Sequence, residues 1–252
     1  MTDRTLSEKF KKNFTVKPLI ETFSFFRVYV RDIVTFLLYA TVPVIIIENF
    51  ISYYAMNYDF PLEVKHLPVI LHFLYQPIYT GGLIYLISKI IEGEKWNIKG
   101  CLLVGLSCWI NLLVVNIISS LFIILGLFAF IIPGLFIFAR LSLAEFSVVL
   151  DRINPLEALY HSFKISKKFT WQIISSALLL SIILLGFQLL IHLLIVTLSL
   201  ANIFTFMATE LLIIILWSTF TILFFRFYDL ANKELLQSNE KETQETPVND
   251  RS

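Results

Sequence analysis

The chain has 252 residues, of which 57% are hydrophobic and 15% are charged. Charged residues make up about 25% of an ordinary soluble domain, and the mean hydropathy of +0.78 is an apolar excess that one water-soluble core cannot use. These values exclude an ordinary soluble protein, and the net charge of +1 gives no sign of a nucleic-acid partner. The composition predicts an all-α, polytopic integral membrane protein surrounded by membrane lipids.

The chain opens with a basic segment, residues 1–17, and we expect a membrane domain over residues 18–230. The first predicted span covers residues 33–54 and the second covers residues 69–91. Each is a largely apolar stretch of about the 20 residues that a helix needs to cross a bilayer. The polar segment 92–99 then returns the chain to its starting side.

Two later stretches, residues 100–139 and 170–209, are each forty residues long and contain no Lys, Arg, Asp or Glu. A single helix of that length would reach about 60 Å, twice the hydrocarbon thickness of about 30 Å. Each stretch must therefore fold back as a helical hairpin. The four spans expected from the two hairpins are 100–122, 131–150, 171–196 and 204–225.

Two boundaries follow from local residues. The turn of the first hairpin is unusually apolar, with candidate positions at Ser119-Ser120, Gly126 and Pro133-Gly134. Because proline fits the first turn of a helix, we expect the fourth span to begin near Ile131. Residues 231–252 are largely polar and predict a mostly disordered C-terminal tail.

Orientation follows from the distribution of basic residues. With six spans, both termini and the segments 92–99 and 151–170 lie on one side of the membrane. Of the 20 basic residues, all except Lys65 and Arg140 belong to these regions or to the adjoining span ends. Because basic residues accumulate on the cytoplasmic side, we expect both termini in the cytoplasm and the chain in the bacterial cytoplasmic (inner) membrane.

The segment after the fourth predicted span has the pattern of a short amphipathic helix. Asn154, Pro155 and Glu157 provide an N-cap, a first-turn proline and a capping-box glutamate. Its apolar side chains at helical spacing are Leu156, Leu159, Tyr160 and Phe163, and its polar residues include His161, Lys164, Lys167 and Lys168. Such a helix lies in the membrane plane, where each lysine near an anionic leaflet contributes about 1 kcal/mol.

A weaker copy of this pattern, residues 18–31, predicts a second interfacial helix. The alternative for residues 151–170 is a cytoplasmic connector whose lysines only enforce topology. Both interpretations stay open at the level of the sequence.

Among the ionisable residues inside predicted spans, where charge is costly and invites a functional hypothesis, are Arg140, Glu145, Glu48 and Glu210. Arg140 lies near the middle of the fourth span, and Glu145 is too far around that helix to pair with it. Glu48 and Glu210 lie near the outer ends of their spans. We expect Arg140 to form a structural ion pair with Glu48 or Glu210; the alternatives are hydrogen bonds to backbone carbonyls and a substrate or proton pathway.

Signatures of catalysis and of cofactor binding are not found in the sequence. There is no phosphate-binding glycine loop, no HExxH, no GxSxG and no Cys/His set at metal-ligand spacing. His72 and His192 lie in different spans without a carboxylate at helical spacing, so we expect packed histidines and no metal site. We expect no cofactor and no enzyme activity.

A resemblance to a known family rests on four blocks of residues. These are the run 132–143, IPGLFIFARLSL; the run 148–151, VVLD; the run 155–164, which contains Pro155, Ala158 and Ser162; and Trp171. The blocks are similar to those of the YciC-type bacterial inner-membrane proteins and of the membrane domain attached to some glycerophosphodiester phosphodiesterases. The resemblance implies a multi-span protein of the cytoplasmic membrane whose activity is uncharacterised, and it carries no catalytic residues.

Together these patterns predict a six-span helical bundle with two interfacial helices. We expect a non-enzymatic role in the cell envelope, in contact with lipids or with a protein partner at the cytoplasmic face. The alternative is a small-solute transporter or channel that uses Arg140, Glu48 and Glu210.

Overall fold

The computed structural model describes residues 3–57, 66–199 and 202–245, and the surroundings of side chains within 17–55, 66–199 and 202–237. Its described residues form helices and no strands. The helices are α1 (Asp3–Asn57), α3 (Leu67–Ile91), α4 (Ile98–Ala129), α5 (Ile131–Leu141), α6 (Ala144–Leu150), α7 (Pro155–Ile165), α8 (Thr170–Thr197) and α9 (Ile203–Glu245).

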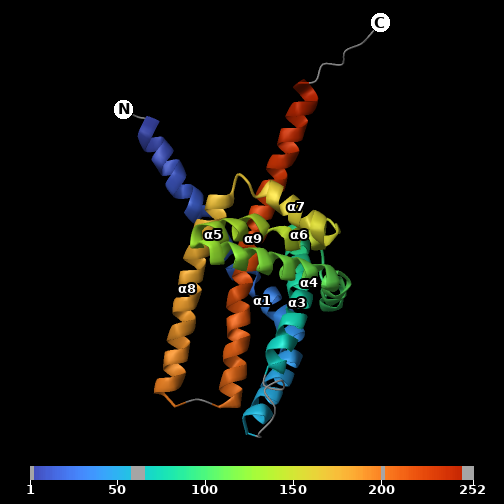
Figure 1. The fold of residues 1–252 in the computed structure, drawn as a ribbon, viewed down its shortest axis with the longest axis vertical. Coiled ribbons are helices and arrows are strands. Elements are labelled where there is room, and N and C mark those ends of the chain that lie inside the picture. Colours follow the sequence, from blue (N-terminus) through green and yellow to red (C-terminus); the bar gives the residue numbers. More distant parts are fainter. Residues whose placement is uncertain (1–2, 58–65, 200–201, 246–252) are drawn as a thin grey trace.

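Six helical stretches are long and apolar enough to cross a membrane, which confirms the predicted all-helical fold with six candidate spans. They are Lys17–Ala55, Leu67–Ile91, Ile98–Ala129, Ile131–Leu150, Thr170–Thr197 and Ile203–Gln237. In Figure 1, the start of α1, the end of α9 and α7 lie at one end of the molecule, whereas the turn between α8 and α9 lies at the other. Both described ends of the chain therefore lie on the same side of the molecule.

The hydrophobic core lies where α1, α3, α6 and α9 meet. Phe36, Ile84, Phe146 and Phe227 are at most 1% exposed. Close packing of α3 against α4 depends on small residues, because a side chain at Gly105 would collide with the carbonyl oxygen of Ile78. The short helix α6 has only 7 residues, and because most of them are buried it belongs to the core of the bundle.

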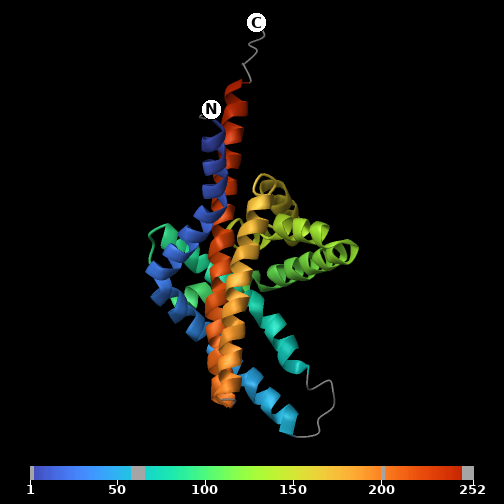
Figure 2. The same cartoon turned by 90° about the vertical axis from the view of Figure 1, so that its left-hand side faces the viewer.

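The α4–α5 hairpin runs across α8 and α9 instead of alongside them, in both Figure 1 and Figure 2. Its turn is the single residue Phe130, between Ala129 and Ile131. Gly126 and Gly134 face each other there, since a side chain on Gly126 would come within 2.9 Å of the Gly134 Cα atom. The expected start of the fourth span near Ile131 matches the first residue of α5.

Several boundaries differ from those expected. The third predicted span, 100–122, is part of a 32-residue helix, because no charged residue and no proline interrupts it before Phe130. The fourth, 131–150, is two helices with a break at Ser142 and Leu143. The first span and the segment before it form one helix with a kink at Tyr29.

The C-terminal segment also differs from the expectation of a disordered tail over residues 231–252. Helix α9 continues to Glu245, and residues 246–252 lie outside the described part of the chain. Residues with high helix propensity, such as Ala231, Glu234 and Leu235, occupy this extension. Lys233 adds an ion pair with Asp229, one turn earlier, at 2.8 Å.

Candidate functional site

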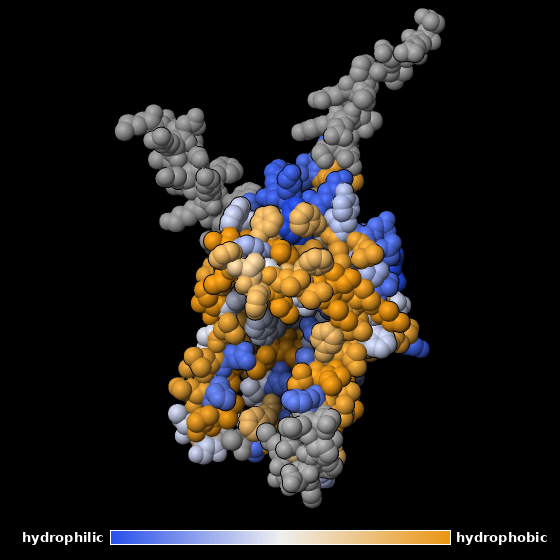
Figure 3. All heavy atoms as spheres, viewed as in Figure 1, coloured by the Kyte–Doolittle hydropathy of each residue, from blue (hydrophilic) through white to orange (hydrophobic). Residues whose placement is uncertain are grey.

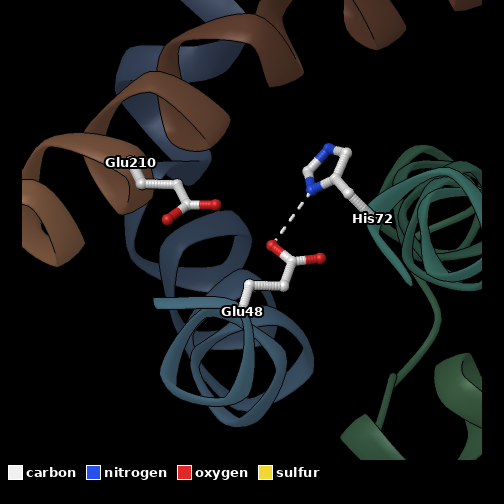
Figure 4. A group of neighbouring side chains, drawn as sticks. All are labelled: Glu48, His72 and Glu210. Atoms are coloured by element: carbon white, nitrogen blue, oxygen red, sulfur yellow. Dashed lines mark hydrogen bonds and ion pairs between the residues drawn. The ribbon is translucent and has the colours of Figure 1, made fainter. Parts of the chain in front are cut away.

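Three ionisable side chains from three helices meet in the half of the bundle near the α8–α9 turn. Glu48 comes from α1, His72 from α3 and Glu210 from α9, and one ligand atom of each lies within 4.8 Å of the others. Figure 4 shows the three side chains pointing toward one another. The Nδ1 atom of His72 lies 3.4 Å from the Oε2 atom of Glu48.

Glu48 is almost completely enclosed, at 5% exposure. Its second carboxylate oxygen, Oε1, is buried and has no hydrogen-bond partner among the described residues. A buried carboxylate oxygen is normally satisfied, because leaving it unpaired has a large desolvation cost. The group therefore has unused capacity to bind a donor or a cation.

Glu210 is held in place by the neighbour of Glu48. The side-chain amide of Asn49 donates to the Oε2 atom of Glu210 at 2.7 Å and to the carbonyl of Ile45 at 2.9 Å. This pair of bonds fixes the orientation of the Glu210 carboxylate from the side of α1. It is the kind of supporting contact that orients ligands in metal sites.

The cluster borders a cavity of about 870 Å³. Its walls are mostly apolar. The polar residues that line it come from α1, α3, α6, α8 and α9 and include Asn49, His72, Gln76, Glu145, Gln188 and Glu210. Figure 3 shows hydrophilic residues inside a hollow of this otherwise hydrophobic face. A mostly apolar cavity with a few converging polar groups is typical of a ligand site.

The wall of the cavity toward the core is closed by apolar side chains. Leu37, Leu83 and Phe146 line it and are at most 2% exposed. Glu145 also borders this wall and accepts a hydrogen bond from Asn116 of α4. A second, smaller hollow of about 410 Å³ reaches Glu48, His72 and Glu210 from the region of Pro68.

The expected ion pair of Arg140 with Glu48 or Glu210 is wrong. Arg140 ends α5 beside α7, which lies at the opposite end of the bundle from the α8–α9 turn (Figure 1). Its guanidinium lies 4.0 Å from the ring centroid of Phe163, and its Nε and Nη1 atoms have no hydrogen-bond partner among the described residues. The crosswise direction of α5 keeps Arg140 away from the carboxylates.

Helix α7 begins as predicted, with the Asn154 side chain accepting from the backbone N–H of Glu157 at 2.9 Å. Its burial differs from the expectation, because Leu159 is 8% exposed and packs inward. The apolar side chains that stay exposed are Leu156, Tyr160 and Phe163, and the exposed lysines of this region are Lys164, Lys167 and Lys168. Of these lysines, Lys168 forms an ion pair with Glu234 of α9.

The sequence identified Glu48 and Glu210 but did not group them with His72. Spacing along one helix could not reveal this group, because its members are separated by 24 residues and then by more than half the chain. Their positions along the helices could have suggested the group. Each residue lies within about two or three turns of the helix end on the α8–α9 side. Three polar residues at one depth in neighbouring spans can meet.

The described helices define a class: an all-helical chain with six helices of membrane-spanning length and apolarity. Comparisons with protein-family models, with curated proteins and with solved structures find no match.

Proposed function

We propose that this chain is a multi-pass membrane protein that binds a divalent transition-metal cation at Glu48, His72 and Glu210 and moves it across the membrane. The observation that carries the proposal is the convergence of two carboxylates and one imidazole beside a cavity, where one buried oxygen of Glu48 has no hydrogen-bond partner among the described residues. This proposal develops the transporter that the sequence offered as the alternative function. His72 replaces Arg140 as the third residue beside Glu48 and Glu210.

The donor set supports this class of cation. Imidazole nitrogen with carboxylate oxygen suits Zn²⁺ and similar first-row metals, whereas Ca²⁺ and Mg²⁺ prefer oxygen alone. Two carboxylates balance the charge of a divalent ion, which removes the cost of holding either charge in a mostly apolar wall. Three protein ligands leave one coordination position for water or for the next site along a path.

The shape of the cavity supports movement of the ion. It is closed toward the core by Leu37, Leu83 and Phe146 and reaches the cluster from the other side. A polar site beside a cavity that ends at apolar core side chains has the form of a carrier's substrate site in one of its two states.

The membrane, its identity and the orientation are part of the proposal. The excess of basic residues near α7 supports a cytoplasmic position for that end of the bundle and an outward position for the metal cluster. The similarity of the Pro133-to-Trp171 region to the YciC-type family supports the bacterial cytoplasmic membrane.

A second role is compatible with the first. Leu156, Tyr160 and Phe163 of α7 are exposed next to Lys164 and Lys167. An exposed apolar strip beside basic residues favours contact with the surface of an anionic leaflet. The lipid-contacting role expected from the sequence therefore belongs, in this proposal, to the α7 end of the molecule.

The test uses the purified full chain in liposomes. We expect saturable binding of Zn²⁺ at one site by calorimetry, and entry of Zn²⁺ into liposomes that contain a zinc-sensitive dye. Glu48→Gln removes one ligand charge with little change in shape and should abolish both signals. Glu94→Gln is the matched control, because Glu94 is exposed and paired with Lys89 away from the cavity.

The outcomes separate the two halves of the proposal. Absence of saturable binding of Zn²⁺, Mn²⁺ or Co²⁺ to the wild-type chain contradicts the metal site. Binding that Glu48→Gln removes, together with no entry into liposomes, keeps the site and contradicts transport.

A further inference from the structure

The α4–α5 hairpin has a direction and a length that do not suit a pair of membrane spans. It runs across α8 and α9, near the α7 end of the molecule, and its tip projects away from the bundle in Figure 2. Helix α4 has 32 residues, or about 48 Å, against a hydrocarbon layer of about 30 Å. A helix placed upright at this length would push its end well beyond the bilayer.

The end of α4 and the turn are apolar on most sides. From Asn116 to Ala129, Gly126 is the one buried residue of α4, and the other side chains include exposed leucines, isoleucines and phenylalanines. At the tip, Phe128 is 93% exposed, Phe130 76% and Ile131 71%. Exposing such large apolar side chains to water is costly, so a tip that emerges on the far side of the membrane would be strongly unfavourable.

Part of the backbone of the turn is hydrogen-bonded within the hairpin. Irregular backbone is excluded from lipid when its polar groups lack partners. Here the N–H of Phe130 donates to the Gly126 carbonyl at 3.0 Å, and the N–H of Gly134 donates to the Phe130 carbonyl at 3.3 Å. Pro133 has no N–H to satisfy. The N–H groups of Ile131 and Ile132, which open α5, receive no side-chain cap.

Both ends of the hairpin return to the polar end of the molecule. The chain enters α4 through Lys95, Trp96 and Lys99 and leaves α6 through Asp151 and Arg152. Helices that lie at the headgroup level have one polar face, as α7 does. The last turns of α4, from Leu121 to Ala129, contain no polar side chain, which favours a position below the headgroups, among the acyl chains.

From these observations we infer that the α4–α5 hairpin does not cross the bilayer but lies in the plane of the membrane, inside the leaflet on the α7 side. Its partner is the acyl chains of that leaflet, which contact the exposed side chains from Ile117 to Ile132. The bundle then crosses the membrane with α1, α3, α8 and α9, and the hairpin displaces lipid from one leaflet only. This inference is independent of the metal site.

The test places one new cysteine in the full-length chain, in sealed membrane vesicles of either orientation, and adds a membrane-impermeant maleimide. Phe130→Cys reports the tip, and Ser199→Cys, in the α8–α9 turn, is the control. The unmodified chain gives the background, because Cys101 and Cys108 are buried. We expect Ser199→Cys to react from its own side and Phe130→Cys to react from neither side until detergent is added.

A second measurement identifies what surrounds the tip. A bimane fluorophore attached to Phe130→Cys in detergent, followed by reconstitution, should be quenched by lipids that carry a nitroxide on the acyl chain. Reaction of Phe130→Cys from the side of Ser199 shows a spanning hairpin, and reaction from the α7 side shows a hairpin on the membrane surface; either result overturns the inference. Absence of quenching shows a tip covered by protein and overturns it as well.

Discussion

At the residue scale, Glu48 has surroundings unlike those of an ordinary buried carboxylate. One oxygen faces His72 at 3.4 Å and the other is buried without a partner among the described residues. An ionised carboxylate in such a place carries an uncompensated desolvation cost of several kcal/mol. A bound cation removes this cost, and it links the stability of the three-helix junction to the metal.

Asn49 provides a sensitive test of this arrangement, because it orients Glu210 without belonging to the ligand set. Asn49→Leu keeps the size of the side chain and removes the 2.7 Å bond to the Glu210 carboxylate. Loss of such a supporting contact typically weakens metal affinity by about 10–100-fold, and calorimetry with Zn²⁺ should show a decrease in this range.

Arg140→Gln is the matched control for that experiment. Its side chain lies beside Phe163, far from the cluster, so the affinity for Zn²⁺ should stay unchanged. Equal effects of Asn49→Leu and Arg140→Gln would contradict the assignment, because they would show a general loss of folding instead of a local effect.

The pH dependence of binding has a defined sign. Metal ions bind neutral imidazole and ionised carboxylate. In more acidic solution the free ligands carry protons, and the metal must displace these protons in order to bind. The affinity for Zn²⁺ should therefore fall when the pH is lowered from about 7.5 to about 5.5. Titrations in two buffers of different ionisation enthalpy measure the protons released, and an affinity independent of pH would exclude His72 as a ligand.

At the scale of helices, buried serine hydrogen bonds connect α5, α6 and α7. Ser162 of α7 donates to the Arg140 carbonyl at 2.7 Å and accepts from the Leu143 N–H at 3.2 Å. Ser166 adds a bond to the same carbonyl at 3.1 Å. These bonds satisfy the backbone where the helix breaks, and they place α6 in the core.

Ser162→Ala should destabilise the protein by about 1–3 kcal/mol, because it leaves the buried N–H of Leu143 unpaired. The control is Ser175→Ala, which removes a bond within α8 to the carbonyl of Gln172. The measurement is the free energy of unfolding in mixed micelles titrated with denaturing detergent. A Ser162→Ala effect no larger than that of Ser175→Ala would contradict the role of this connection.

The break between α5 and α6 could not be predicted, because residues 131–150 are apolar enough for one continuous span. Nothing local forces the chain to stop at Ser142; the break depends on Ser162, twenty residues later. In contrast, the start of α7 was predicted correctly, since its cap and its proline lie within four consecutive residues. Local signals were sufficient for caps and insufficient for tertiary hydrogen bonds.

At the scale of the whole molecule, composition alone predicted an all-helical protein with six candidate spans, and the structure agrees. The crosswise direction of α4 and α5 was not predictable, because hydropathy reports whether a segment suits lipid and not how it is oriented in it. The grouping of Glu48, His72 and Glu210 also required the three-dimensional packing of α1, α3 and α9.

The proposed orientation makes a prediction for reporter fusions. A reporter that works only outside the cytoplasm should be active when inserted after Ser199, and one that works only in the cytoplasm should be active when fused after Gln237. This follows from the excess of basic residues at the α7 end. The reverse pattern would place the metal cluster on the cytoplasmic side and contradict the proposed direction of access.

The most direct test of the metal site is X-ray absorption spectroscopy of the zinc-loaded, full-length protein. We predict one imidazole nitrogen and two or three oxygen neighbours at about 2.0–2.2 Å from the zinc, with the imidazole contribution lost in His72→Gln. A spectrum with two or more imidazoles or with sulfur ligands, or one that His72→Gln leaves unchanged, would contradict a site formed by Glu48, His72 and Glu210.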